Sequence, residues 1–255
     1  MVARWVVEKP AAALPWKSLY DSHFPTTSAT TSPYLWVGRT KNYSPLRSRI
    51  KETALTVGSF AAEYYGRFLE DGTNQRIDTY GGAKENRVRF LLDIVDEVTE
   101  AIGPDRVGVR LSPFGQYGGI RDSNPLELFT FVIQELDKRR ISYLHLIEAK
   151  GSEMGLTDQL HEDAVNNAAL FREVFHGPLL SAAAYSPESA ALAIEKNHAD
   201  AIAFGRLFIA NPDLVRRIKE CQPLNAYDRS TFYGGGENGY TDYKTLGKQS
   251  LTASI

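Results

Sequence analysis

The sequence has a single cysteine, Cys221, among its 255 residues, so no disulfide can form within the chain. A protein without disulfides suits a reducing compartment, and we expect it in the cytoplasm. It also lacks an apolar run long enough to cross a bilayer, which excludes a spanning helix and any membrane partner from the expectation. The formal net charge is only -2, so charge gives no reason to expect a nucleic-acid partner. The five histidines show no metal-like spacing, and we expect no metal site.

The first 33 residues lack sustained hydrophobic periodicity and are rich in Pro, Ser, Thr and Ala. A segment of this composition buries too little apolar surface to fold, so we expect residues 1–33 to be poorly ordered. Glu8 and Asp21 argue against a transit peptide, and no signal-peptide core is evident. We therefore expect the folded domain to span residues 34–255.

Beyond residue 105, apolar runs and helix-starting pairs such as Asn-Pro and Ser-Pro predict strands and helices in alternation. The predicted strands are 106–111, 141–147, 178–184 and 199–204, and the predicted helices are 124–140, 162–175, 186–196 and 211–221. Such alternation favours parallel strands joined by right-handed crossovers. An open doubly wound sheet and part of a (β/α)8 barrel both fit the pattern. No GxGxxG follows a strand, which disfavours a dinucleotide-binding fold.

Upstream of residue 105, the pattern predicts a strand over 34–39 and helices over 50–69 and 84–102. Residues 71–90 read DGTNQRIDTYGGAKENRVRF, and their glycines and turn-forming Asp and Asn residues predict a long loop running into the second helix. A loop with so many positioned polar groups is either a functional loop or a plain surface connection.

Ligands of α/β folds lie at the carboxyl ends of the strands, where three features stand out. Arg110, late in an apolar strand, needs an anionic or hydrogen-bonding partner, which is either a ligand or an internal salt bridge. The small residues Ala183 and Ala184 allow backbone N–H groups to approach a phosphate, although they also suit tight packing. Gly205 permits close approach of a ligand, and Arg206 can bind a phosphate with two hydrogen bonds.

Several stretches of the sequence resemble segments of one protein family, and they occur in the same order along the chain as in that family. Residues 71–90 are similar to the DGTN-x-R-x-D-x-YGG-x-x-ENR-x-RF signature of the old yellow enzyme family of flavin-dependent ene-reductases. Further matches are VGVRLSP at 107–113, FGRLFIANPDL at 204–214 and the tail at 223–246. The resemblance runs from Phe68 to the C-terminus and nearly vanishes upstream. It implies an incomplete TIM (β/α)8 barrel, mainly its C-terminal four βα units.

The resemblance also implies FMN as cofactor, NADPH or NADH as reductant, and reduction of the activated C=C bond of a small enone. It implies FMN contacts at the following residues: Arg110, Ala183, Ala184, Gly205 and Arg206. Arg110 would lie near N1 of the flavin ring, and the others would hold the phosphate, although Ala183 stands where the family usually has Gly. Tyr240 matches a tyrosine on the substrate side of the flavin, and anchoring the tail is its alternative role.

No catalytic residue can be assigned. An ungapped alignment on Phe68-Leu69 places Gly58, Ala61 and Glu63 where the family has its substrate-activating pair and its proton-donating Tyr. These residue types cannot polarise a carbonyl or deliver the proton. The chain is then either an impaired enzyme, a non-catalytic flavin-binding or assembly partner, or a general phosphate-ligand domain. Half a barrel would leave open strand edges, which predicts a homodimer or pairing with a full-length relative.

Overall fold

The computed structural model describes residues 66–115, 119–150, 163–232 and 236–247, and the backbone alone of 35–38 and 55–57. Residues 1–33 lie outside this part of the chain, so their poor order and the domain boundary at 33 stay predictions.

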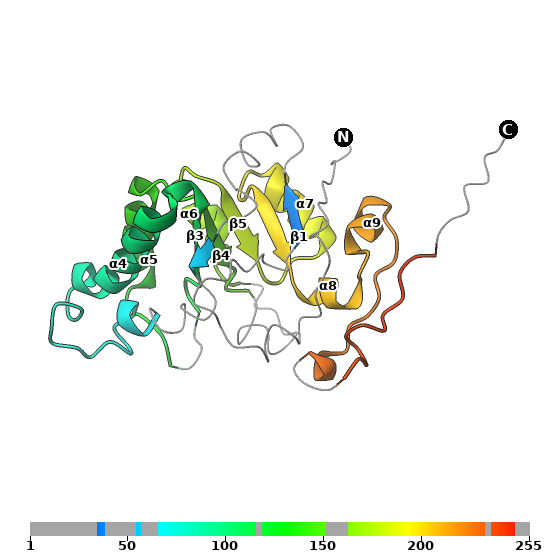
Figure 1. Ribbon diagram of the computed structural model, residues 1–255, viewed down its shortest axis with the longest axis horizontal. Helices are drawn as coiled ribbons and strands as arrows, with labels where there is room; N and C mark the ends of the chain where they lie inside the picture. The colour runs from blue at the N-terminus through cyan, green and yellow to red at the C-terminus, as the bar shows by residue number, and fades with distance from the viewer. Residues whose placement is uncertain are drawn as a thin grey trace.

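The described chain forms one six-stranded sheet in the order β1-β6-β5-β4-β3-β2 (Figure 1). Neighbours from β2 to β6 are parallel, as the alternating pattern predicts, whereas β1 closes the other edge antiparallel to β6. The strands are β1 (Leu35–Gly38), β2 (Leu55–Val57), β3 (Val107–Leu111), β4 (Tyr143–Ile147), β5 (Leu179–Ala182) and β6 (Ala201–Phe204).

Local capping signals set the starts of two helices. Asn124 caps α5, because its side chain accepts a hydrogen bond from the Glu127 N–H at 3.4 Å, and a proline follows it. Ser186 and Ser189 form a capping box at the start of α7. The helices are α4 (Lys84–Ile102), α5 (Pro125–Lys138), α6 (Asn167–Phe171), α7 (Pro187–Glu195), α8 (Arg206–Ala210) and α9 (Leu214–Lys219), with 3-10 turns at Pro104–Arg106 and Arg229–Thr231.

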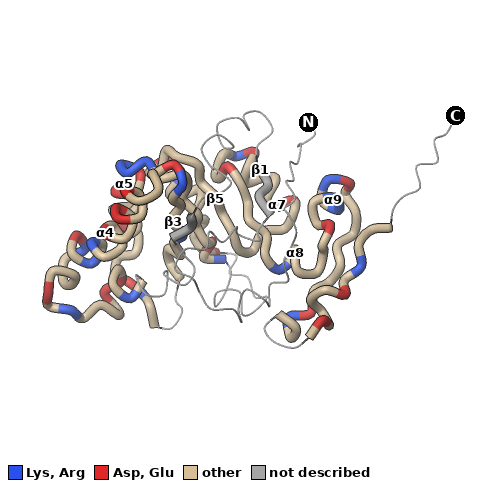
Figure 2. Tube along the Cα trace, viewed as in Figure 1, with Lys and Arg blue, Asp and Glu red and all other residues tan. Residues whose placement is uncertain are grey.

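The core lies between the helices and the sheet. The apolar stripes of α4 and α5 are fully buried against the strands, with residues such as Val88, Leu91, Val132 and Leu136 at 0% exposure. Basic and acidic residues are interspersed along these two helices (Figure 2). No helix among the described residues is long and apolar enough to cross a membrane.

The helix predicted over 50–69 is wrong at residues 55–57, which form β2. Leu55, Thr56 and Val57 pair in parallel with Val107, Gly108 and Val109 of β3. Two of these three residues are β-branched, and sheet pairing overrides the helical spacing. Residues 66–69 alone are helical in the described part of this range, with the Glu70 N–H bonded to the Gly66 carbonyl at 3.1 Å.

The helix predicted over 211–221 is present as α9 but is shorter, because it begins only at Leu214 and a separate short helix, α8, precedes residue 211. Asn211 does not cap α9. Its amide group donates to the Leu207 carbonyl at 2.8 Å and accepts from the Asn225 N–H at 2.7 Å, so it ties α8 to the tail. The helix predicted over 162–175 is shorter than expected and spans Asn167–Phe171.

Candidate functional site

A cavity of about 360 Å³ opens beside the carboxyl ends of β5 and β6. It is lined by Ala183, Ala184, Tyr185, Ser186, Pro187, Ala203, Phe204, Gly205, Arg206, Leu207, Leu224 and Tyr227. Four of the predicted ligand-binding residues therefore share one cavity, although they come from two different strand ends. They meet because β5 and β6 are parallel neighbours, with Ala182 opposite Ala203, so the turns after both strands emerge at the same edge.

The turn after β5 is held in an unusual backbone conformation. Ala183 has φ 78° and Ala184 has φ 59°, both in the left-handed region that favours glycine. Each costs about 1–2 kcal/mol in an alanine, and strain of this kind concentrates at binding sites. The short methyl side chains leave the main chain accessible to a ligand. Gly205, by contrast, has φ -102°, so its conformation does not require glycine.

Arg206 supplies the positive charge of the cavity. Its guanidinium carbon lies 5.9 Å from the ring centroid of Tyr227, a cation–π distance. Tyr227 comes from the C-terminal segment and packs in turn against Phe232, with 5.5 Å between the ring centroids. Leu207 and Leu224 add apolar wall. A cationic fork beside apolar surface suits an anionic group, such as a phosphate, on a partly apolar ligand.

Behind this wall lies a buried carboxylate that the sequence analysis does not single out. Glu148 follows β4 directly and is 4% exposed. Its carboxylate accepts hydrogen bonds from the Asn167 N–H at 2.7 Å, the Ala168 N–H at 3.0 Å and the Ser181 hydroxyl at 2.6 Å. The Tyr185 hydroxyl lies 3.3 Å from it. Burial, followed by the nearby Glu148, raises the pKa of Tyr185 above its ordinary value, so the phenol stays a donor. An acidic residue closing an apolar strand was the signal available in the sequence.

Arg110 lies on β3, outside the residues that line this cavity. Strands β4 and β5 separate β3 from β6, so at the usual strand spacing the two lie about 14 Å apart. Arg110 is paired in register with His145 of β4. Complete burial, and secondarily the charge of Arg110, hold the pKa of His145 well below its ordinary value. His145 is thus a neutral, buried core residue.

Tyr240 is half-buried in the C-terminal segment, and its N–H donates to the Glu237 carbonyl at 3.0 Å. Burial raises the pKa of its phenol. It does not line the cavity, so its part in substrate binding stays a prediction. Gly58, Ala61 and Glu63, which align with the family's substrate-activating pair and proton-donating Tyr, lie outside the described residues. No group of three or more His, Cys, Asp or Glu within the described ranges could hold a metal ion.

Residues 61–225 match the NADH:flavin oxidoreductase / NADH oxidase family. The chain belongs to this family. It is 43% identical over 183 residues to 12-oxophytodienoate reductase 2 of Arabidopsis thaliana, a match that covers 71% of this chain and 47% of the relative.

Two solved structures with a similar fold are morphinone reductase and the old yellow enzyme of Trypanosoma cruzi. Morphinone reductase gives a TM-score of 0.65 at 40% identity, covering 76% of this chain and 50% of that one. The trypanosomal enzyme gives a TM-score of 0.64 at 32% identity, covering 71% of this chain and 46% of that one. The chain thus spans about half the length of the relatives it matches.

The family match spans residues 71–90, 107–113 and 204–214 and confirms the resemblance that they carry, whereas the resemblance of the tail at 223–246 stays a prediction. The matches also decide between the two architectures that the sequence left open. The parallel sheet with its helices is part of a TIM barrel, as predicted, and not an open doubly wound sheet.

In the longest stretch of the family signature, residues 71–90, side chains form hydrogen bonds with the backbone of the loop itself and of the residues just before it. The Asn74 amide donates to the carbonyls of Phe68 and Tyr80, and its oxygen accepts from the Arg76 N–H at 3.0 Å. A side chain at Gly81 would collide with the carbonyl of Arg76. The loop therefore needs these residue types to hold its own shape.

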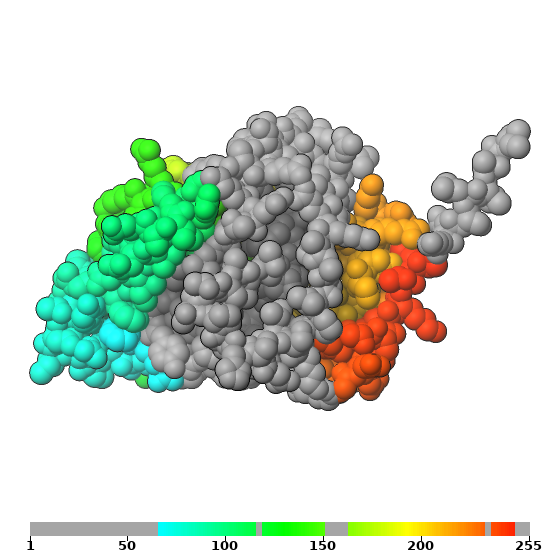
Figure 3. Space-filling model, viewed as in Figure 1, coloured from blue at the N-terminus to red at the C-terminus, as the bar shows by residue number. Residues whose placement is uncertain are grey.

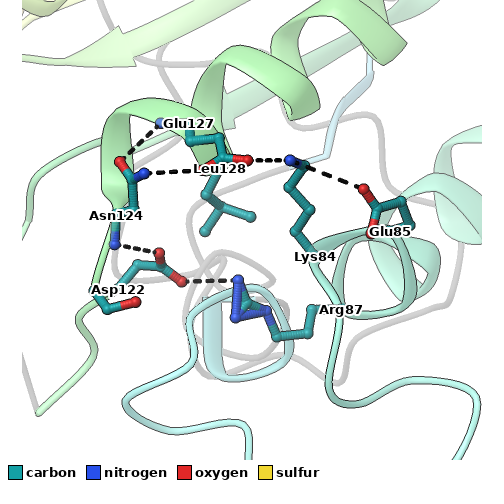
Figure 4. Close-up of a pocket in the computed structure, with 8 residues that line it drawn as sticks. Lys84, Glu85, Arg87, Asp122, Asn124, Glu127 and Leu128 are labelled. Atoms are coloured by element: carbon teal, nitrogen blue, oxygen red, sulfur yellow. Dashed lines mark hydrogen bonds and ion pairs between the residues drawn. The ribbon is translucent and has the colours of Figure 1, made fainter.

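A second cavity of about 300 Å³ lies where this loop meets the start of α5, and its charged residues are paired with one another (Figure 4). Arg87 bonds Asp122 at 3.1 Å, with both side chains largely buried. Lys84 bonds Glu127 and lies 3.9 Å from Glu85. Because these charged side chains are paired with one another, we interpret this cavity as part of the contact between α4 and α5 and not as a ligand site.

Proposed function

We propose that this chain is an FMN-dependent NAD(P)H oxidoreductase of the old yellow enzyme type, which reduces activated C=C bonds of α,β-unsaturated carbonyl compounds. The observation that carries the proposal is the gathering of Ala183, Ala184, Gly205 and Arg206 around one cavity. Membership of the NADH:flavin oxidoreductase / NADH oxidase family supports both the cofactor and the reaction class. Two of the relatives are reductases of 12-oxophytodienoate and of morphinone, which supports an enone as substrate.

The cavity fits the phosphate end of FMN by the chemistry of its lining. Arg206 offers a two-pronged donor, and the short side chains of Ala183 and Ala184 leave main-chain N–H groups accessible to phosphate oxygens. Arg110 lies on β3, with β4 between it and β5, and would place its positive charge at the other end of an elongated ligand. When bound, FMN would accept a hydride from NADPH or NADH and pass it to the alkene.

A cation beside the reduced ring favours its negative charge, so Arg110 would raise the reduction potential of the cofactor. Tyr240 would line the substrate side. We place the protein in the cytoplasm, with a homodimer or a full-length relative covering the parts of the barrel that this chain does not supply.

A second function is favoured by one specific observation. Gly58, Ala61 and Glu63 stand at the positions of the family's catalytic residues, and none of them can bind a carbonyl oxygen and protonate a carbon. A non-catalytic flavin-binding or assembly partner would need the phosphate cavity but not these residues. Both functions therefore predict that the chain binds FMN, but only the oxidoreductase predicts turnover of an enone.

The test is the visible spectrum of the freshly purified protein, followed by reconstitution with FMN and an assay of NADPH and NADH oxidation with cyclohexenone. Yellow protein that oxidises either nicotinamide faster when the enone is present supports the oxidoreductase. Yellow protein that gives no enone-dependent oxidation supports the non-catalytic partner. Colourless protein that takes up no FMN contradicts both, and a sugar phosphate then becomes the ligand to test in the cavity.

A further inference from the structure

Four hydrogen-bond donors converge on the buried carboxylate of Glu148. Two are backbone N–H groups, those of Asn167 and Ala168 at the start of α6, at 2.7 and 3.0 Å. Two are hydroxyls, those of Ser181 at 2.6 Å and Tyr185 at 3.3 Å. One side chain thus connects the end of β4 with α6 and with the turn after β5.

The two hydroxyls bracket the strained part of the phosphate cavity. Ser181 precedes Ala183 and Ala184 in the sequence, and Tyr185 follows them directly. The Tyr185 hydroxyl also lies 3.0 Å from the Ser181 hydroxyl, so its single proton is shared between that oxygen and the carboxylate, and both ends of the turn are fixed to each other and to Glu148. Tyr185 is itself a wall of the cavity, and its hydroxyl reaches away toward Glu148.

The two left-handed alanines would relax if nothing held them, because their conformation is unfavourable for an L-residue. None of the bonds of Glu148 reaches the cavity directly, since Glu148 does not line it. Its contacts act on the residues before and after the turn. The arrangement therefore holds a backbone shape at the cavity and adds no ligand contact of its own.

We propose that Glu148 is a positioning residue for the phosphate cavity, which fixes the Ala183-Ala184 turn by binding Ser181 and Tyr185 on either side of it. This inference deepens the proposed function and rests on it. The residue touches neither the ligand nor the reacting atoms. Its effect reaches the ligand through the direction in which the turn presents its main-chain N–H groups.

Glutamine cannot replace Glu148 in this role. A carboxylate accepts at both oxygens, whereas an amide offers one acceptor and one donor. Whichever way the amide is turned, its NH₂ group faces a buried N–H or hydroxyl donor. With the NH₂ group at Oε1, the Ala168 N–H and the hydroxyls of Ser181 and Tyr185 lose their acceptor. With it at Oε2, the Asn167 N–H loses its acceptor, and the start of α6 loses its bond to Glu148.

The experiment measures the affinity of the full chain for inorganic phosphate by calorimetry, and for FMN by quenching of flavin fluorescence. The variants are Glu148→Gln and the milder Tyr185→Phe, which removes only one hydroxyl. The control is Leu136→Ala, a fully buried core residue of α5 that does not line the cavity. We expect Glu148→Gln to lower the affinity for both phosphate and FMN by about tenfold or more, since small displacements of positioned groups have large effects on binding.

Tyr185→Phe should lower the affinity for both ligands by a smaller factor. Leu136→Ala should lower the stability of the protein and leave both affinities unchanged. If Glu148→Gln fails to fold, the loss in Tyr185→Phe alone carries the result. Affinities in the folded variants equal to those of the wild type would overturn the positioning role and leave the phosphate site standing. Wild-type protein that binds neither phosphate nor FMN would overturn the proposed function and this inference together.

Discussion

The two ends of the described chain use polar residues in opposite ways. Figure 3 shows the cyan and green residues that begin at 66 at one end of the molecule and the orange and red residues of the described C-terminal segment at the other. At the first end, the amides and charges of the long family signature, residues 71–90, are paired with nearby protein groups. At the second, shorter matches form a cavity with a strained turn and an arginine beside an aromatic ring. The length of a sequence signature thus reflects how many residues a local structure requires, and not where a ligand binds.

The first end holds the more demanding electrostatics. Glu70 is 6% exposed and lies near two other acids, Asp71 and Asp122, with Arg87 as the nearby cation. Arg87 bonds Asp122 at 3.1 Å and lies 3.8 Å from Asp71. A buried charge is tolerated only with such partners. Stability should therefore respond most strongly to changes at this end, and ligand affinity to changes at the other.

The largest expected effect is that of Arg87→Ala. Removing the cation leaves the buried Asp122 without it, so the free energy of unfolding should fall by about 3–5 kcal/mol. Urea denaturation followed by circular dichroism measures this change. The matched control is Arg89→Ala on the exposed side of α4, which should cost less than about 1 kcal/mol. Equal losses in the two variants would contradict the proposed role of the buried pair.

The second effect concerns pH. Burial, followed by the charges of Asp122 and Asp71, raises the pKa of Glu70 from 4.5 to about 8. The folded state then holds this proton more tightly than the unfolded state. The contribution of Glu70 to stability is fully present below about pH 4.5 and is lost as the pH rises through 8, by an amount on the order of 4 kcal/mol.

Urea denaturation of the wild type and of Glu70→Gln between pH 5 and pH 8.5 measures this contribution. The variant carries no titrating group at this position, so its stability should change less with pH in this window. A variant whose pH dependence parallels that of the wild type would show that Glu70 is ionised throughout.

The third effect lies at the other end. Arg206→Ala should lower the affinity for FMN about 10- to 100-fold, because a hydrogen-bonded ion pair with the phosphate is lost. The affinity of Arg206→Lys for FMN should lie between those of the wild type and Arg206→Ala, because an ammonium keeps the charge but lacks the planar geometry of the guanidinium. Arg216→Ala is the control, since Arg216 pairs with Glu220 on α9 and does not line the cavity. Fluorescence titration measures all of these, and an Arg206→Ala affinity equal to that of the control would place the ligand elsewhere.

The smallest effect tests the strained turn. Ala183→Gly should raise the free energy of unfolding by about 1 kcal/mol, because glycine adopts φ 78° without strain. The same substitution within a helix, Ala191→Gly in α7, should lower it by about 1 kcal/mol. Thermal unfolding compares the two variants, and changes of the same sign would show that the turn stores no strain.

Local chemistry made part of this structure predictable. The bounds of α4, residues 84–102, follow from its apolar spacing and from the Gly-Pro pair after it, and they match the structure. The starts of α5 and α7 follow from a cap and a proline. The gathering of Ala183 and Arg206 in one cavity also follows, because parallel strands bring their carboxyl ends to one edge.

Contacts between distant residues made the rest unpredictable. Residues 55–57 form a strand only because β3 offers them an edge. Asn211 leaves its capping role because Asn225, 14 residues further on, binds it. Glu148 is absent from the sequence-based site because its donors lie up to 37 residues away. No spacing rule identifies donors at that separation.

The central claim is that the cavity beside β5 and β6 binds the phosphate of a flavin. A titration of the wild-type chain with FMN and with riboflavin, which lacks the phosphate, tests it most directly, with inorganic phosphate as competitor. The account predicts that FMN binds at least about tenfold more tightly than riboflavin and that phosphate displaces FMN. Equal affinities for FMN and riboflavin, with no competition by phosphate, would contradict it.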